Sequence, residues 1–389
     1  MRILHTSDWH LGRPFHGEDL LAAQRVYVDH LIRTVEAYEV DLVVVSGDIY
    51  DRALPPVDAV ALADDAFTRL ARSRARVVIT SGNHDSARRL GFSSRLVDAA
   101  GVHLRTDAGR LHVPVLLRDE HGPVAVYGIP FLEPDVVRHA WDLPARSHHA
   151  ALGEAMRRIR DDLARQPPGT RSVVMAHAFV AGGQPSESER DIAVGGISLV
   201  PLELFDGIDY TALGHLHGRA TLTASVRYSG SPLAYSFSEA GQVKGSWLVD
   251  LDSNGLAEVR FLAAPVARDL ACIEGTLDEL LTDPRLQAHE SAWVQATLTD
   301  AVRPTRAMER LRTRFPHTLA LRFAPEGGEE APSRPATVGK SAHAIALDFV
   351  NHVRGAPATP DESDLLRTAL ECCSDDPDLV VERDTVVSR

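Results

Sequence analysis

Short apolar runs, each followed at once by polar residues, constrain the fold of this chain more than any other feature. Five such runs lie at residues 3–4, 42–45, 77–79, 173–175 and 210–213. Runs of this length bounded by polar residues are typical of buried strands. An amphipathic segment between the first two places Leu21, Val28, Leu31, Ile32 and Val35 at helical spacing. Strand–helix–strand repetition predicts an α/β core.

Composition narrows the class of protein. The 389 residues suffice for two or three domains, and 44% hydrophobic with 24% charged residues is typical of a globular protein. No apolar run approaches the roughly 18 residues of a membrane span, and the N-terminus has no secretory signal. Cys272, Cys372 and Cys373 lack metal-motif spacing. We therefore expect a cytoplasmic protein and exclude a membrane protein, a disulfide scaffold and a zinc ribbon.

The net charge of −13 is unfavourable for a nucleic-acid-binding protein. A bound divalent cation, however, supplies local positive charge that the net charge does not count.

The chain divides into five predicted parts. Residues 1–264 carry the α/β pattern, with further strands at 124–127, 226–228 and 246–249. Residues 265–325 alternate strands and helices in the order of a small α+β domain, and residues 326–340 form a linker rich in Pro and Gly. Two short amphipathic helices are expected within 341–374, the second beginning at a capping box from Thr359 to Glu362. Residues 375–389 form an acidic tail.

Polar clusters follow five of the predicted strands. They are Asp8-Trp9-His10, Gly47-Asp48, Gly82-Asn83-His84-Asp85, His177 and Gly214-His215-Leu216-His217. Ligands of open α/β sheets bind beyond the carboxyl ends of strands, so we expect these clusters to converge.

Carboxylates, an amide and imidazoles without thiolate suit Mn²⁺, Fe²⁺ or Zn²⁺ rather than Ca²⁺. The two oxygens of Asp48 can bridge a pair of ions, which would hold a phosphate and lower the pKa of a shared water. A single Gly-Asp is usually a turn, and a lone His-x-His is more often structural. Only the joint occurrence of five clusters predicts a metal site.

This set of motifs resembles the calcineurin-like metallophosphoesterase superfamily. The resemblance implies a four-layer α/β/β/α sandwich with a dinuclear metal site, followed by a small α+β capping domain and a C-terminal helical pair. The segments 6–12, 46–51 and 228–233 are similar to SbcD, the nuclease component of bacterial SbcCD complexes, which belongs to the double-strand-break-repair nuclease family.

The resemblance assigns the site residues. The first ion would be bound by Asp8, His10, Asp48 and His217, and the second by Asp48, Asn83, His177 and His215. Two Mn²⁺ are implied, with Mg²⁺ or another divalent metal as the alternative. His84 would act on the scissile phosphate and the leaving 3′ oxygen, and Asp85 would orient His84. Asp51 stands where some family members have a second histidine.

The activity implied is hydrolysis of DNA phosphodiester bonds, as an exonuclease on double-strand ends and an endonuclease on single strands and hairpins. The implied partners are DNA, with Arg190 on a loop beside it, a second copy of the nuclease domain, and the SbcC ATPase bound by the helical pair in a heterotetramer. The implied roles are nucleoid-associated DNA repair, replication and recombination.

Two other functions remain open at this point. The same metal core serves small-molecule phosphoesterases and cyclic nucleotide phosphodiesterases, and an inactive DNA-binding scaffold is the third interpretation. Trp9 is expected to pack beside the site, and His148 and His149 are expected on the surface.

Overall fold

The computed structural model describes residues 1–189, 199–325, 341–354 and 356–374. Its first sheet has six strands in the order β14-β13-β1-β4-β5-β6. These strands are β1 (Arg2–Thr6), β4 (Leu42–Ser46), β5 (Arg76–Thr80), β6 (Val102–Arg105), β13 (Gly245–Asp252) and β14 (Gly255–Ala263). Strands β1, β4, β5 and β6 are parallel, and β13 and β14 are antiparallel additions.

The second sheet also has six strands, in the order β11-β12-β10-β9-β8-β7. They are β7 (Val115–Asp119), β8 (Gly122–Gly128), β9 (Arg171–His177), β10 (Tyr210–Gly214), β11 (Ala220–Thr221) and β12 (Val226–Tyr228). Strands β8, β9, β10 and β12 are parallel to one another.

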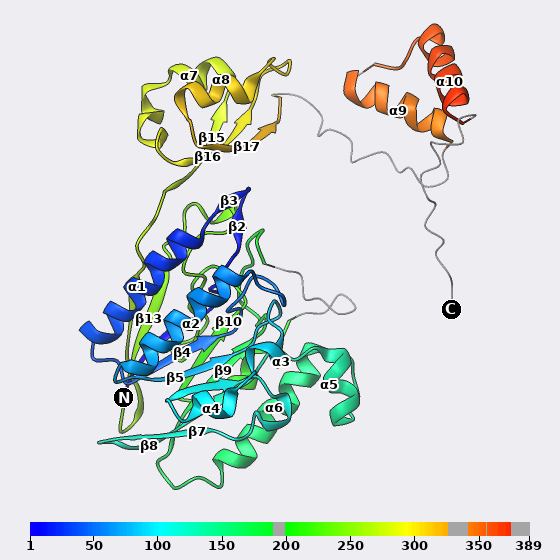
Figure 1. The fold of residues 1–389 in the computed structure, drawn as a ribbon. Coiled ribbons are helices and arrows are strands. Elements are labelled where there is room, and N and C mark those ends of the chain that lie inside the picture. The colour runs from blue at the N-terminus through cyan, green and yellow to red at the C-terminus, as the bar shows by residue number, and fades with distance from the viewer. Residues whose placement is uncertain (190–198, 326–340, 355, 375–389) are drawn as a thin grey trace. The chain divides into compact units, whose positions relative to one another are not determined.

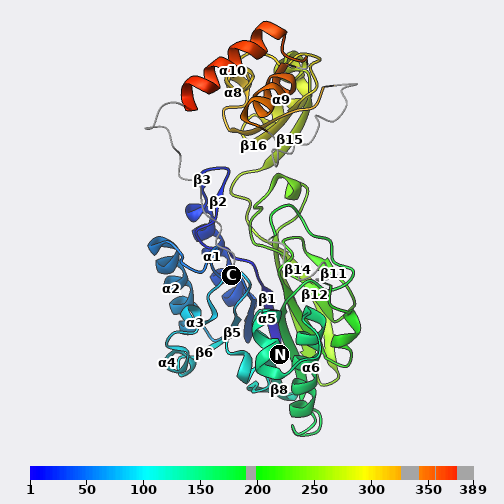
Figure 2. The same cartoon turned by 90° about the vertical axis from the view of Figure 1, so that its right-hand side faces the viewer.

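The two sheets pack face to face, with helices on both outer sides (Figures 1 and 2). Between the sheets lie side chains such as Val44, Val126 and Met175. The alternate side chains Val43 and Val45 face α1 (Leu21–Ala37) and α2 (Val57–Arg72). On the other side, α6 (His148–Leu163) packs on the second sheet. Because both faces of each sheet are covered, the central strands are apolar throughout. The predicted four-layer sandwich is confirmed.

Shorter elements complete the first domain. They are α3 (Ala87–Leu90), α4 (Ser94–Asp98), α5 (Pro134–Trp141), the hairpin of β2 (Pro14–Phe15) and β3 (Glu18–Asp19), and 3-10 helices at Ala108–Arg110, Leu202–Phe205 and Phe237–Glu239.

The expectation that His148 lies on the surface is wrong, although His149 is exposed. His148 is buried and its ring lies 5.6 Å from that of Phe131. His148 is the first residue of helix α6 and lies on the face that packs against the sheet. Two adjacent histidines in a sequence do not indicate which of them is buried.

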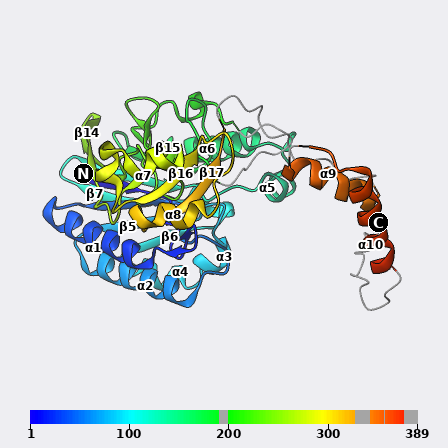
Figure 3. The same ribbon diagram turned by 90° about the horizontal axis from the view of Figure 1, so that it is seen from above.

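A three-stranded sheet in the order β15-β16-β17 follows (Figure 3). It consists of β15 (Leu270–Gly275), β16 (Trp293–Leu298) and β17 (Thr318–Phe323), with α7 (Leu277–Thr282), α8 (Ala307–Arg314) and a 3-10 helix at Pro284–His289. Trp293 packs on Phe15, whose ring centroid is 5.5 Å away. The predicted alternation of three strands and two helices is confirmed, the 3-10 helix at Pro284–His289 was not predicted, and the boundaries at 264 and 325 stay predictions.

Helices α9 (Ala342–Arg354) and α10 (Pro360–Ser374) pack on each other and belong to a separate unit of the chain. The capping box at the start of α10 is confirmed, since Thr359 N–H donates to Glu362 and Glu362 N–H donates back to Thr359 Oγ1. The linker 326–340 and the tail 375–389 lie outside the described residues. Within the described chain, every helix is too short or too polar to cross a bilayer.

Candidate metal centre

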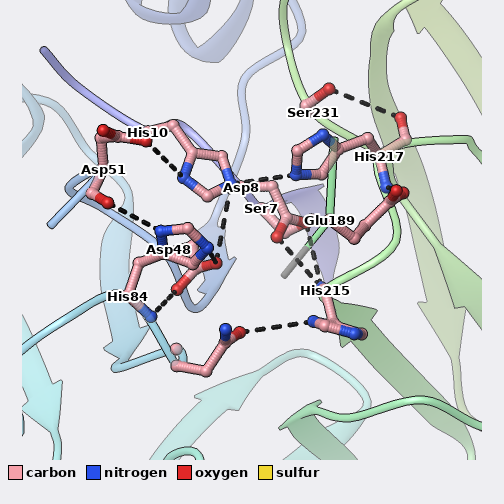
Figure 4. A network of polar contacts seen from close by, with 12 residues as sticks. Ser7, Asp8, His10, Asp48, Asp51, His84, Glu189, His215, His217 and Ser231 are labelled. Atoms are coloured by element: carbon pink, nitrogen blue, oxygen red, sulfur yellow. Dashed lines mark hydrogen bonds and ion pairs between the residues drawn. The ribbon is translucent and has the colours of Figure 1, made fainter. Parts of the chain in front are cut away.

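The predicted ligands come from loops that follow strands of both sheets. Asp8 and His10 follow β1, Asp48 follows β4, His177 ends β9, and His215 follows β10. Parallel strands of one sheet place their carboxyl ends at one edge, and the packing of the sheets brings the two edges together. All seven predicted metal ligands converge there, and Figure 4 labels five of them.

Several of these residues have strained backbones. Asp8, His10, Asp48 and His215 have φ angles of 52°, 45°, 51° and 103°. A left-handed conformation at a non-glycine residue costs roughly 1–3 kcal/mol and is concentrated at functional sites. The surrounding structure therefore maintains a side-chain arrangement that the local backbone would not adopt by itself.

Glycines beside the ligands allow close approach. A Cβ atom on Gly214 would lie 1.9 Å from the Ser46 carbonyl oxygen, and one on Gly47 would lie 2.3 Å from His177 Nδ1. A Cβ atom on Gly82 would lie 2.1 Å from Asp48 Oδ1. The glycines are required because a predicted ligand side chain or a backbone carbonyl occupies the space that a Cβ atom would need.

One half of the cluster is built around His10. Its Nε2 atom lies 3.0 Å from His217 Nε2 and 3.6 Å from Asp48 Oδ2. Asp8, His10 and His217 together form a buried triad whose ligand atoms all lie within 4.8 Å of one another. Two nitrogens about 2.1 Å from a common cation would be separated by about 3 Å, so this pair fits a shared ion.

The other half is built around His177. Its Nε2 atom lies 3.4 Å from Asp48 Oδ2 and 2.9 Å from Asn83 Oδ1. His215 Nδ1 lies 3.3 Å from the same Asn83 oxygen. Asp8, Asp48 and His177 also form a buried triad. Asp48 therefore faces both halves, which is the geometry expected of a bridging carboxylate.

The second ring nitrogen of two histidines is already occupied. His177 Nδ1 lies 2.9 Å from the Ser46 carbonyl oxygen, and His217 Nδ1 contacts Ser188 Oγ with Glu239 Oε1 3.4 Å away. Metal-binding histidines usually donate their other N–H to a carbonyl or carboxylate in this way. The donor set thus fits divalent cations.

Comparison with known proteins agrees with the family resemblance of the sequence motifs. A family model described as calcineurin-like phosphoesterase matches residues 1–219, more than half of the chain. The chain belongs to the calcineurin-like phosphoesterase family. A second model, SbcD_C, described as the type 5 capsule protein repressor C-terminal domain, matches residues 266–343 of this phosphoesterase.

Two curated relatives of the phosphoesterase are both named as the SbcD component of the nuclease SbcCD. The protein of Staphylococcus saprophyticus is 30% identical over 82% of this chain and 84% of its own length. That of Staphylococcus epidermidis is 29% identical over 82% of this chain and 85% of its own length.

Burial and mutual charge shift the pKa values of the site. Burial raises the pKa of Asp48, but His177, His10 and His84 outweigh it and hold the value well below the usual range. Burial lowers the pKa of His177, yet Asp48 and Asp8 raise it to about 9. Burial is the main cause that raises the pKa of Asp8 to about 6 and lowers that of His215. A proton on His177 balances the carboxylates when no cation does.

His84 and Asp85 occupy different positions in the phosphoesterase. His84 Nε2 lies 4.0 Å from Asp48 Oδ2, and its Nδ1 lies 2.7 Å from the Asp51 carbonyl oxygen. The Asp85 carboxylate accepts backbone N–H groups of Ile49, Tyr50 and Gly82. Asp85 therefore fixes the loop that carries His84, and the ring itself is oriented by the Asp51 carbonyl.

Sequence reasoning missed the polar residues behind His217. Glu189 accepts the backbone N–H of His217 at 2.7 Å, and Ser188 donates to the buried Glu239. Lys244 forms an ion pair with Glu239. The sequence of segment 186–189 indicates a solvated loop, because nothing in it shows which distant residue it contacts. Arg190 lies outside the described residues.

Trp9 is confirmed as a packing residue. It is fully buried, and its indole N–H donates to Thr6 Oγ1 at 3.0 Å.

A first prediction concerns Gly214. Replacing it by alanine places a methyl group against the Ser46 carbonyl, so the loop carrying His215 and His217 must move. We expect Gly214→Ala to lower the metal content measured by elemental analysis. The matched control is Gly153→Ala, where open space surrounds the new methyl group on helix α6 and a gain of up to about 1 kcal/mol is expected. Full metal content in Gly214→Ala would contradict the proposed geometry.

A second prediction concerns pH. Neutral imidazole binds a cation, whereas in protein stripped by a chelator His177 keeps its proton up to about pH 9. Binding must expel that proton, so metal affinity should rise as the pH rises towards 9 and fall in acid. Calorimetric titration at about pH 7.5 in buffers of different ionisation enthalpy should report net proton release. Zero release would show that His177 is not a ligand.

Proposed function

We propose that this phosphoesterase is a metal-dependent DNA nuclease of the SbcD type. The observation that carries the proposal is the buried Asp48 carboxylate facing two histidine clusters, one from each half of the site. The two relatives named as components of the nuclease SbcCD support the choice of DNA as the substrate.

The proposed ligands are Asp8, His10, Asp48 and His217 for one ion and Asp48, Asn83, His177 and His215 for the other, with Mn²⁺ as the proposed metal. A pair of bound cations supplies Lewis-acid stabilisation of phosphoryl charge and activates water. General acid–base catalysis alone gives about 10²–10⁴-fold, far less than hydrolysis of a phosphate ester requires.

The chain's own residues supply the rest of the chemistry. His84 lies at the rim of the site, with its Nδ1 facing a carbonyl oxygen and its Nε2 directed towards Asp48. In this orientation Nε2 can contact the scissile phosphate and pass a proton to the leaving 3′ oxygen. Asp85 acts as a positioning residue, because it ties the His84 loop to the loop after β4.

A small-molecule phosphoesterase or cyclic nucleotide phosphodiesterase is the second candidate, because the metal core is the same. The α+β domain of residues 265–325 favours a polynucleotide. Its Trp293 packs on Phe15 of the loop that follows His10, and Arg322 lies 3.6 Å from Glu187 of the loop behind His217. A small substrate has no need of a second domain attached to both loops.

A third prediction distinguishes the proposed metal ligand Asp48 from the proposed general acid His84. Asp48→Ala should abolish cleavage of a DNA hairpin and lower metal content, because both ions lose a ligand. His84→Ala should reduce the rate by about 10²–10⁴-fold while both ions stay bound. Cleavage assays with Mn²⁺ and elemental analysis of both variants provide the measurement. Loss of an ion in His84→Ala would make His84 a ligand, in line with its grouping with His10 and Asp48.

The helical pair is proposed to bind the SbcC ATPase. Phe349 and Val353 of α9 and Leu365 of α10 are exposed although all are apolar. Phe349 and Val353 lie four residues apart and share a face. Two helices this short are marginal alone, and apolar faces of this kind bind a partner helix or groove.

A fourth prediction tests this partner. Deleting residues 340–389 should abolish co-purification with SbcC and leave Mn²⁺-dependent cleavage of single strands intact. A double Phe349→Glu, Val353→Glu variant keeps the chain length and should have the same effect. If the truncated protein still co-purifies with SbcC, the helical pair is not the docking element; if only the double variant does, Phe349 and Val353 lie outside the contact.

A homodimer through the first domain is also proposed, within a heterotetramer that acts in DNA repair, recombination and replication in the cytoplasm. Apolar side chains are exposed at the start of α2 and around α3 and α4, namely Leu54, Val57, Phe92 and Leu96. The two segments are tied together because Arg89 Nη1 donates to the Ala53 carbonyl at 3.2 Å. Exposed apolar patches of this kind mark protein–protein contacts.

A fifth prediction follows. Phe92→Glu should convert the protein from dimer to monomer in light scattering after gel filtration, since a charge would be buried at the interface. The matched control is Val266→Glu, at an exposed apolar residue outside this patch, which should leave the dimer intact. A Phe92→Glu dimer would locate the interface elsewhere.

A further inference from the structure

Arg13 lies at the mouth of the metal centre. With Pro14, Asp51, Arg52 and His84 it lines an open cleft of about 490 Å³. His84 is the residue proposed to act on the scissile phosphate, so a substrate that reaches it passes Arg13.

The guanidinium of Arg13 is held in place but not saturated. Its Nη2 atom donates to the Ser188 carbonyl at 2.7 Å, and its carbon lies 5.1 Å from the centre of the Tyr235 ring. Its Nη1 atom is buried and has no acceptor among the described residues. The Arg13 side chain is 16% exposed, and an anion in the cleft would approach this exposed part.

Charge at this cleft favours an anion. Arg13 Nε lies 3.7 Å from Asp51 Oδ1, and Arg52 Nη2 lies 3.7 Å from Asp51 Oδ2. Two guanidinium groups therefore share one carboxylate, and the cluster carries a net charge of +1. A phosphodiester carries a single negative charge, which a cluster of this net charge attracts.

Arg13 lies beside the proposed metal ligands, on the far side of the Asp51 carboxylate from His10. His10 Nε2 faces His217 and Asp48, whereas its Nδ1 faces Asp51 at 3.9 Å. Arg13 lies on the Asp51 side of that ring. An imidazole ring and a carboxylate thus separate the guanidinium from the metal positions.

We propose that Arg13 binds a backbone phosphate next to the scissile one, and so determines the preference for a polynucleotide over a small phosphodiester. This inference rests on the proposed nuclease function and deepens it. Tyr235 supports the role, because its ring packs against the guanidinium and also against His10, at 5.4 Å between ring centroids. The phosphate subsite and the metal centre thus share one rigid wall.

The test compares two substrates in the full-length, Mn²⁺-loaded protein. Arg13→Gln should lower kcat/KM for a fluorescent oligothymidylate by about 10- to 100-fold, mainly through KM. Hydrolysis of bis(p-nitrophenyl) phosphate and the content of two ions per chain should not change. Arg13→Lys should restore part of the loss, because it keeps the charge but not the fork. The matched control is Arg33→Gln, at an exposed arginine of helix α1.

Salt dependence gives an independent readout. In a His84→Ala background, oligothymidylate binding followed by anisotropy should lose about 0.7 from its log–log salt slope when Arg13 is replaced by glutamine. An unchanged slope and unchanged kcat/KM, or an equal loss on both substrates, would overturn the proposal. If the unmutated protein hydrolyses only the small diester, the nuclease function fails, and the binding experiment still decides the role of Arg13.

Discussion

The buried carboxylate of Asp48 is the group on which the rest of the site depends. It is 2% exposed, and an isolated carboxylate in such a place would be very unfavourable. His10, His84 and His177 surround its Oδ2 atom at 3.4–4.0 Å, and the backbone N–H of His84 donates to Oδ1. A medium of low dielectric constant makes these attractions strong, and it also makes the position favourable for cations.

The four-layer sandwich maintains this arrangement. Ligands from loops of both sheets meet only if the strands keep one register, because a slip of one residue would exchange the side chains of each strand's two buried faces and move its ligand-bearing end. The apolar layer between the sheets, which includes Val44, Val126 and Met175, fixes that register. Its packing offsets the cost of positive φ angles at Asp8, His10, Asp48 and His215.

The segment 186–189 connects the metal centre with its surroundings. Glu189 and Ser188 contact His217, the Ser188 carbonyl holds Arg13, and Glu187 pairs with Arg322 of β17. One short loop thus orients a predicted ligand, anchors the cation at the mouth of the cleft and reaches the small α+β domain. A change in the conformation of this loop would therefore alter the contacts of His217, of Arg13 and of Arg322 in the α+β domain.

The sequence alone determined the α/β class, most central strands and the seven residues that converge, because buried parallel strands are apolar throughout and each ends in a polar cluster. It also marked Gly47, Gly82 and Gly214. It did not identify the strands β6, β7 and β14, in which buried side chains alternate with partly or fully exposed ones. Only the tertiary structure decided that Asp85 holds a loop, that Asp51 presents its carbonyl to His84, that His148 is buried, and that Ser188, Glu189 and Glu239 lie behind His217. Those contacts join residues tens to hundreds of positions apart. The sequence around a serine or a glutamate does not indicate which distant residue its side chain contacts.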